Sequence, residues 1–248
     1  MLKVSIITVS YNSADTIRDT IESVISQNYP NIEYIVIDGA SKDKTLDIVR
    51  EYEDQIAIVR SEPDKGIYDA MNKGIHLASG DIVGILNSDD IFASNDVIER
   101  VATAFDNSTD GIFADLVYVD RENTDRITRT YKSDNFSPWK IRFGMTLPHP
   151  TFYIRRSFYT KLGLYKLTYR VAADFELIAR FIKSGLRIKH LPMTLVKMRE
   201  GGISSSELKW RVHQNFEIVR ACRENKIYTN ILLVAFKIPF KLLSYVKT

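Results

Sequence analysis

The sequence has few of the residues that cross-link or interrupt a fold. It contains one cysteine in 248 residues, Cys222, so no disulfide can form within the chain. Its 11 glycines and 7 prolines leave no collagen-like or low-complexity stretch, and no internal repeat is present. No group of cysteines and histidines has zinc-binding spacing. These absences exclude disulfide-rich, zinc-finger and fibrous proteins.

Charge and hydropathy exclude further classes. The 34 basic and 31 acidic side chains give a net charge of +3, which is too balanced to favour binding of nucleic acid over the whole surface. The N-terminus lacks the basic and apolar regions of a secretory signal. The most apolar stretch, 231–246, is interrupted by Lys237, Pro239 and Lys241 and is too short to span a membrane. We therefore expect a cytoplasmic protein with no nucleic-acid partner.

The first part of the sequence alternates β-branched runs with segments of helical periodicity. The pattern predicts strands at 4–9, 34–38, 56–59 and 82–86, and helices at 13–27, 44–52 and 67–77. The run 82–86 is apolar throughout, as is typical of a parallel strand that is covered on both faces. This alternation predicts an α/β fold with a mainly parallel sheet.

The second part predicts a more mixed structure. We expect a helix at 96–105, antiparallel strands at 111–119 and 126–131, an irregular segment at 136–150, a strand at 151–154, a helix at 173–183, and strands near 188 and 195. From residue 207 the sequence is mostly helical. We therefore divide the chain into an α/β domain, residues 1–203, and a C-terminal helical extension, residues 204–248.

Polar residues directly follow four of the predicted strands, where ligands bind in open parallel sheets. Their sequences are TVSYN at 8–12, DGAS at 38–41, SEPDKG at 61–66 and NSDD at 87–90. Neither a dinucleotide-binding glycine motif nor a P-loop is present, so a bound phosphate would need another source of positive charge. The pair Asp89 and Asp90 can hold Mn²⁺ or Mg²⁺, which binds phosphate oxygens. The alternative for each single carboxylate is a helix cap or a turn.

These motifs, in this order and at these intervals, resemble those of the family 2 glycosyltransferases over about residues 3–203. The resemblance rests on the runs at 4–12, 37–43, 61–74 and 86–90. It implies the GT-A fold, which is a Rossmann-like, mixed but mainly parallel sheet flanked by helices. It also implies a nucleotide-diphosphate sugar donor, usually a uridine one, and a divalent metal, Mn²⁺ or Mg²⁺.

The resemblance also implies roles for individual residues. The residues expected to bind the nucleotide are Thr8, Val9, Tyr11, Asp38, Ser41, Asp64, Lys65 and Ser88. Thr8 and Tyr11 would lie beside the base, and Asp38 would hydrogen-bond it. Asn87-Ser88-Asp89 occupies the family's Asp-x-Asp motif, in which Asp89 would contact the metal. Asn87 departs from the motif, because aspartate is common at that position.

A carboxylate in the second half completes the family's pattern. Asp174, in the sequence AADFE at 172–176, matches the family's base, and the alternative is that it only caps its helix. Glu176 should point away from Asp174 on a helix. One base and no nucleophile with a partner base indicate a single displacement with inversion. Further candidate contacts to donor or acceptor are Asn87, Asp90 and His149.

The sequence therefore predicts an inverting hexosyl- or N-acetylhexosaminyl-transferase that uses a UDP-sugar. Its expected acceptor is a glycan or a lipid-linked precursor in cell-surface polysaccharide synthesis, at the inner face of the cell membrane. The alternative is a catalytically inactive, nucleotide-sugar-binding partner subunit. Residues 227–248 interleave lysines with bulky apolar residues, which suits peripheral membrane contact and equally a helix packed on the core or on a second subunit.

Overall fold

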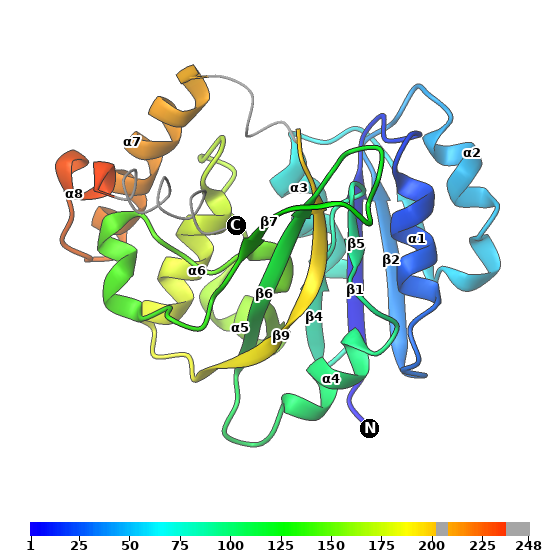
Figure 1. The fold of residues 1–248 in the computed structure, drawn as a ribbon, viewed down its shortest axis with the longest axis horizontal. Helices are drawn as coiled ribbons and strands as arrows, with labels where there is room; N and C mark the ends of the chain where they lie inside the picture. The colour runs from blue at the N-terminus through cyan, green and yellow to red at the C-terminus, as the bar shows by residue number, and fades with distance from the viewer. Residues whose placement is uncertain (202–207, 237–248) are drawn as a thin grey trace.

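A computed structural model describes residues 1–201 and 208–236 of the chain. Within these residues, nine strands form one sheet flanked by helices (Figure 1). The strands are β1 (Val4–Ser10), β2 (Ile32–Asp38), β3 (Ile58–Ser61), β4 (Ile82–Ile85), β5 (Asp90–Phe92), β6 (Gly111–Val119), β7 (Ile127–Tyr131), β8 (Tyr153–Arg155) and β9 (Ile188–Arg199). Their order is β3-β2-β1-β4-β8-β6-β9-β5, with β7 paired to β6.

The helices connect these strands in the alternation that the sequence predicts. The α-helices are α1 (Ile17–Ile25), α2 (Thr45–Arg50), α3 (Ile67–Leu77), α4 (Val97–Ala104), α5 (Ser157–Leu162), α6 (Ala173–Lys183), α7 (Leu208–Glu224) and α8 (Ile231–Ala235). The 3₁₀ turns are η1 (Glu53–Gln55), η2 (Pro138–Phe143) and η3 (His149–Thr151). The expected irregular segment at 136–150 thus contains a 3₁₀ turn, η2, and most of another, η3.

The strands β3, β2, β1 and β4 are mutually parallel, whereas β8 runs antiparallel to both of its neighbours, β4 and β6. Strand β7 pairs antiparallel with β6, as the sequence predicts. The sheet is therefore mixed but mainly parallel. Because β1 to β4 point the same way, the loops that follow them gather at one end of the sheet.

Side-chain alternation in the strands divides the core into two layers. Ile6 of β1 is buried with Ile21 on the face covered by α1, α2 and α4. Its neighbour Ile7 is buried on the opposite face with α3, α6 and α7. Gly74 of α3 lies so close to this face that a Cβ there would approach Ile7 Cγ2 to 2.4 Å. Glycine therefore lets α3 pack against β1.

The structure adds two short elements that the sequence analysis does not predict, β5 and α5. They have three and six residues, too few for a hydrophobic period to be visible. Strands near 188 and 195 are instead one strand, β9, whose register against β6 shifts beside Ala114 and Asp115. Pro192 lies at the shift and has no N–H to donate to the ladder, which explains the irregularity.

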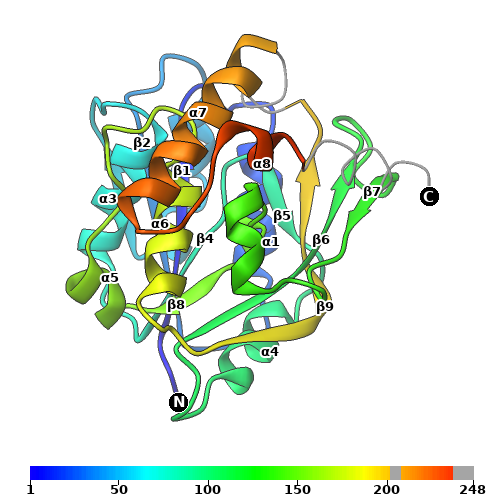
Figure 2. The same cartoon turned by 90° about the vertical axis from the view of Figure 1, so that its left-hand side faces the viewer.

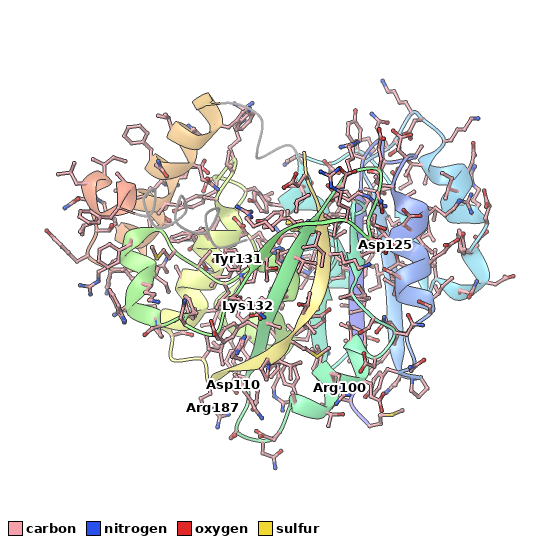
Figure 3. The ribbon with its side chains drawn as sticks, in the orientation of Figure 1. Arg100, Asp110, Asp125, Tyr131, Lys132 and Arg187 are labelled. Carbon is pink, nitrogen blue, oxygen red and sulfur yellow. The ribbon has the colours of Figure 1, made fainter. Side chains whose placement is uncertain are left out.

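At the start of β6, far from the strand ends described above, Arg187 pairs with Asp110 at 2.8 Å (Figure 3).

The C-terminal helices pack on the α/β core. Helix α7 crosses beside α6, with α8 next to it (Figure 2), and Ile218, Ala221 and Cys222 of α7 are buried, as is Val234 of α8. The division near residue 203 and residues 237–248 of the expected membrane-contacting segment lie outside the described residues. No helix in 1–201 or 208–236 has both the length and the apolar character needed to cross a membrane.

Candidate active site

Hydrogen bonds join the loops at the carboxyl ends of β1, β2 and β4. The Asn12 N–H donates to Ser41 Oγ at 2.8 Å, and Asn12 Oδ1 accepts from the Lys42 N–H at 2.9 Å. The Ser13 and Ser88 hydroxyls are hydrogen-bonded at 2.8 Å. The structure therefore brings together Ser41 and Ser88, two of the residues that the sequence analysis assigns to the nucleotide.

Asp38 is a buried hydrogen-bond acceptor at this end of the sheet. It is fully buried, and its carboxylate accepts hydrogen bonds from the Ser41 N–H at 2.9 Å and from the Ser61 hydroxyl at 2.7 Å. The hydroxyls of Ser41 and Ser10 also donate to it, at 2.5 and 3.2 Å. Because four protein donors surround the carboxylate, Asp38 primarily fixes the serines around it.

Tyr11 and Asp64 form an exposed corner above Gly39. The Tyr11 side chain is 61% exposed, which leaves a ring face available for stacking against a ligand. A Cβ on Gly39 would lie 2.5 Å from Asp64 Oδ2 and 3.3 Å from Tyr11 Cδ2. Asp64 accepts a hydrogen bond from the Gly66 N–H at 2.8 Å, and Lys65 is exposed on the same turn.

Two of the expected nucleotide contacts need correction. Thr8 is fully buried, and its hydroxyl accepts a hydrogen bond from the Tyr34 hydroxyl at 3.1 Å. Val9 is 5% exposed and its side chain belongs to the hydrophobic core beside Ile7. Both lie within β1, where alternation directs side chains into the two core layers. Their side chains therefore support the strand, and any contact of these two residues with a nucleotide would come from the backbone.

Unpaired oxygen atoms mark the loop after β4. Asn87 Oδ1 and Asp90 Oδ1 are buried without a hydrogen-bond partner, although Asn87 Nδ2 donates to Asp90 Oδ2 at 3.3 Å. Burial, reinforced by the nearby charge of Asp89, raises the pKa of Asp90 well above its ordinary value. Burial also raises the pKa of Asp89, against the opposing charges of Arg199 and Arg121.

Arg199 of β9 fixes this loop from the second half of the chain. It is 5% exposed, donates to the Asp89 carbonyl at 3.2 Å and pairs with Asp19 of α1. The Arg121 side chain is exposed nearby, 3.8 Å from where a Cβ on Gly201 would lie. The positive charges of both arginines oppose the rise in the pKa of Asp89 that burial causes.

The donor set of this loop fits a hard divalent cation in part. Carboxylate and amide oxygens are the ligands that Mg²⁺ and Mn²⁺ prefer, and unpaired buried oxygens are unusual without a ligand. Within 1–201 and 208–236, however, no three carboxylate, histidine or cysteine side chains converge on one point. Because Mg²⁺ commonly binds through one or two carboxylates together with substrate phosphates, the loop fits a cation that arrives with a nucleotide diphosphate.

Asp174 lies next to α3, which begins just after β3. The Tyr68 hydroxyl of α3 contacts Asp174 Oδ1 at 3.2 Å and the Val171 carbonyl at 2.8 Å. The Asp174 side chain is half-buried, so one side remains open to solvent. Burial and the Asp174 charge raise the pKa of Tyr68, so its hydroxyl stays protonated and can donate. The predicted base is thus held at the end of the sheet where the parallel strands finish.

His149 belongs to the same cluster through Tyr165. His149 Nε2 lies 2.6 Å from the Tyr165 hydroxyl, and the Tyr165 ring stacks on Tyr68 with 5.6 Å between ring centroids. Asn72 of α3 holds the Tyr165 backbone with two hydrogen bonds of 2.9 Å. Burial lowers the pKa of His149, although the Asp174 charge opposes this. The structure therefore places His149 near Asp174, two residues that lie 25 positions apart in the sequence.

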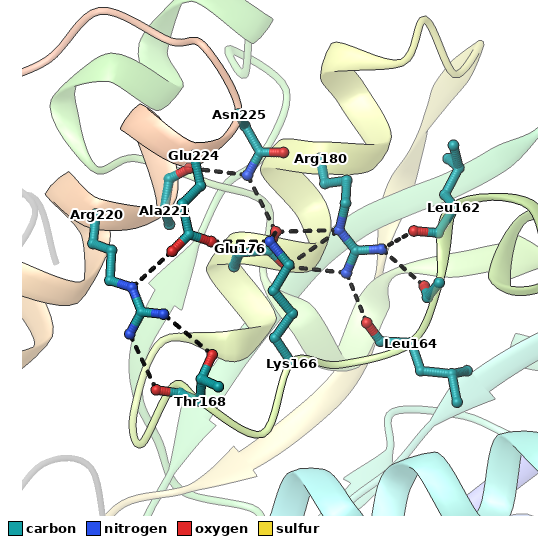
Figure 4. Close-up of polar contacts among 11 residues, drawn as sticks. Leu162, Leu164, Lys166, Thr168, Glu176, Arg180, Arg220, Ala221, Glu224 and Asn225 are labelled. Atoms are coloured by element: carbon teal, nitrogen blue, oxygen red, sulfur yellow. Dashed lines mark hydrogen bonds and ion pairs between the residues drawn. The ribbon is translucent and has the colours of Figure 1, made fainter.

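Glu176 points away from Asp174, as the helical geometry predicts. It is fully buried among Arg180, Lys166 and Asn225, and the Lys166 and Arg180 ion pairs measure 2.8 and 3.0 Å (Figure 4). Arg180 also donates to three backbone carbonyls, those of residues 162–164. This network supports the loop that carries Tyr165.

Four residues that organise the site are not among those expected from the sequence. Tyr68 and Asn72 lie within the run at 61–74 that carries the resemblance, so their helical spacing of four could have indicated a shared face. Tyr165 and Arg199 reach the site only through the tertiary fold, and no local pattern distinguishes them. The contacts at the site thus come from both halves of the chain.

Solved structures share this fold. Staphylococcus aureus TarS in complex with UDP-GlcNAc superposes with a TM-score of 0.69 at 19% identity, over 89% of this chain and 66% of that one. The mannosyltransferase PcManGT from Pyrobaculum calidifontis, in complex with GDP-Man and Mn²⁺, gives 0.68 at 20% identity over 90% and 64%. The chain spans slightly less than two thirds of each. The architecture is that of GT-A glycosyltransferases.

Sequence relatives define the family. The family model described as Glycosyl transferase family 2 matches residues 5–170. An uncharacterized glycosyltransferase of Mycobacterium tuberculosis is 37% identical over 179 residues, which cover 71% of this chain and 68% of that protein. The UDP-Glc:alpha-D-GlcNAc-diphosphoundecaprenol beta-1,3-glucosyltransferase WfaP of Escherichia coli is 26% identical over 86% of this chain and 84% of that one. The chain belongs to glycosyl transferase family 2.

Proposed function

We propose that this glycosyltransferase transfers a hexosyl or N-acetylhexosaminyl group from a UDP-sugar with inversion of configuration. The observation that carries the proposal is the contact between Tyr68 and Asp174. It joins the predicted base to a helix that starts at the carboxyl end of β3, beside the loops that hold Tyr11, Ser41 and Ser88. The base and the nucleotide pocket would then lie on either side of the sugar that is transferred.

The donor pocket is proposed from exposed groups at this end of the sheet. The Tyr11 ring offers a stacking face for uracil, with Asp64 and Lys65 beside it. Asp38 contributes indirectly because it fixes Ser41 and Ser61. UDP is favoured as the nucleotide by the likeness to WfaP, whose name includes UDP-Glc, and to TarS, whose structure contains UDP-GlcNAc.

Asp174 would remove the proton from the acceptor hydroxyl as that oxygen attacks the anomeric carbon. A half-buried carboxylate, held through a single hydrogen bond from Tyr68, keeps lone pairs free to accept that proton. Since no second carboxylate is assigned as nucleophile, one displacement inverts the anomeric centre. Asn87, Asp89 and Asp90 would hold Mn²⁺ or Mg²⁺, which supplies Lewis-acid neutralisation of the diphosphate.

The proposed acceptor is a lipid-linked glycan precursor at the inner face of the cell membrane. WfaP, by its name, acts on a diphosphoundecaprenol-linked sugar, which favours this class of acceptor in cell-surface polysaccharide synthesis. Around α8, large apolar side chains are 73% exposed at Tyr228, 74% at Leu232 and 59% at Phe236. Lys226, which is also exposed, adds positive charge. This face is the proposed peripheral membrane contact.

The test is a scan of UDP-glucose, UDP-N-acetylglucosamine and their galactose counterparts for UDP release with and without Mn²⁺. We expect one donor to be turned over, with product anomeric configuration opposite to that of the donor. Binding of UDP-sugars without turnover of any donor, in the presence of lipid-linked acceptors, would favour the inactive partner subunit instead. For the membrane contact, Leu232→Ser should weaken sedimentation with vesicles rich in anionic lipid, and unchanged sedimentation would refute it.

A further inference from the structure

Helix α7 holds the backbone that immediately precedes Asp174. The Glu217 carboxylate accepts hydrogen bonds from three successive backbone N–H groups, at 2.7, 2.8 and 2.9 Å. The donors are Arg170, Val171 and Ala172. Glu217 is 7% exposed. Because one buried side chain accepts all three hydrogen bonds, Glu217 fixes the backbone of this segment.

The same segment is held from the opposite side by the active-site cluster. The Tyr68 hydroxyl contacts both the Val171 carbonyl and Asp174 Oδ1. Glu217 thus binds the N–H of Val171 while Tyr68 binds its carbonyl. Ala172 is the residue before α6, and Asp174 is the second residue of that helix. A shift of the Val171 peptide would therefore move Asp174 relative to Tyr68.

Other α7 side chains contact the same segment and the residues just before it. The Arg220 guanidinium lies 4.5 Å from the centroid of the Tyr169 ring and donates to the Thr168 carbonyl at 3.2 Å (Figure 4). The Arg170 guanidinium lies 4.7 Å from the centroid of the Trp210 ring. One face of α7 therefore contacts the chain from residue 168 to residue 172.

We propose that Glu217 is a positioning residue for glycosyl transfer, which places Asp174 by fixing the backbone of residues 170–172. The proposal rests on the proposed role of Asp174 as the base. It makes α7 part of the active-site framework, whereas the sequence pattern marks this helix only as an extension. The three N–H groups that donate to Glu217 belong to residues with no assigned role in nucleotide binding, so donor binding should stay unchanged.

The test compares Glu217→Gln with Glu99→Gln, a matched change on the exposed surface of α4. Glutamine keeps the size of the side chain but replaces one accepting oxygen with an NH₂ group, so at least one N–H loses its acceptor. We expect kcat for UDP-sugar turnover to fall roughly 10- to 100-fold, because a small misplacement of a catalytic group lowers the rate by this order. KM for the donor and the Kd for UDP should stay within about twofold, and Glu99→Gln should match the parent.

Glu217→Asp provides a milder variant, since it keeps both oxygens. It should show a smaller loss, again confined to kcat. An unchanged kcat in Glu217→Gln would overturn the inference. A loss of UDP affinity in step with kcat, in both variants, would also overturn it, because Glu217 would then only maintain the fold.

A double-mutant cycle with Asp174→Asn separates this inference from the proposed function. If Glu217 acts through Asp174, adding Glu217→Gln to Asp174→Asn lowers the residual rate no further. A further 10-fold loss in the double variant would overturn the positioning role while leaving Asp174 as the base. Full activity of Asp174→Asn alone would refute the base itself, and the inference with it.

Discussion

Replacing Asp174 by asparagine should separate turnover from both stability and donor binding. The side chain is half-buried, and the one hydrogen bond assigned to it comes from Tyr68, which also has the Val171 carbonyl as an acceptor. Asparagine retains an accepting oxygen, so no buried donor loses its partner. The remaining cost is the loss of a negative charge in the first turn of α6, about 0.3–1 kcal/mol.

That cost corresponds to a decrease in Tm of about 1–4 °C for a chain of this size. Loss of a general base, in contrast, lowers kcat by roughly 10²–10⁴-fold, which is about 3–5 kcal/mol in the activation barrier. The assay measures UDP release from the donor identified by the scan, with UDP affinity determined calorimetrically on the same sample. A kcat within twofold of the parent would refute the base role. Equal losses of kcat and UDP affinity would assign Asp174 to donor binding.

Three other changes test the site and the fold. Asp89→Asn should abolish Mn²⁺-stimulated UDP release with little change in Tm, because a cation loses an anionic ligand, and metal stimulation that survives in this variant would contradict the assignment. Gly39→Ala should weaken UDP binding in calorimetric titration, because the new Cβ would displace the Asp64 carboxylate that lies 2.5 Å away, and parental affinity would exclude Asp64 from the pocket. Burial would raise the pKa of Glu33, but hydrogen bonds, the first from Lys3, outweigh it and lower that pKa to about 2. Since the folded-state pKa is lowered, Glu33 stabilises the fold above its unfolded pKa and this contribution is lost as pH falls from about 4.5 to 2. Glu33→Gln should therefore lower the free energy of unfolding, measured with urea at pH 7, by about 3 kcal/mol. The variant should also lose less stability than the parent as pH falls from about 4.5 to 2. The same loss of stability with pH in both proteins would refute this.

The parallel part of the fold could be predicted because its signals are local. β-branched runs and helical periodicity identify β1, α3 and β4 within a few residues. Elements that depend on distant partners could not be predicted. Strand β5 is three residues long and exists because β9 pairs with it, and the shift in β9 depends on its register with β6.

The candidate site divides in the same way. Positions after strands, such as Ser41, Asp64 and Asp89, could be proposed from sequence because the chain leaves each strand at the same end of the sheet. The burial of the Thr8 side chain could not be predicted, because it depends on where β1 ends. Glu217 could not be predicted either, since a glutamate on a helix has no local feature that distinguishes a buried acceptor of backbone hydrogen bonds from a solvated charge.

The two halves of the chain hold each other's proposed reactive groups. Asp89, in the first half, lies on a loop that Arg199 fixes from the second half. Asp174, in the second half, is held by Tyr68 from the first. Because each carboxylate depends on a partner more than 100 residues away, the site can form only when the whole sheet and α6 are assembled. The family match ends at residue 170, yet Asp174, Arg199 and Glu217 all follow it. The matched segment alone therefore lacks the proposed base and also lacks Arg199 and Glu217, so the proposed active site extends into α7.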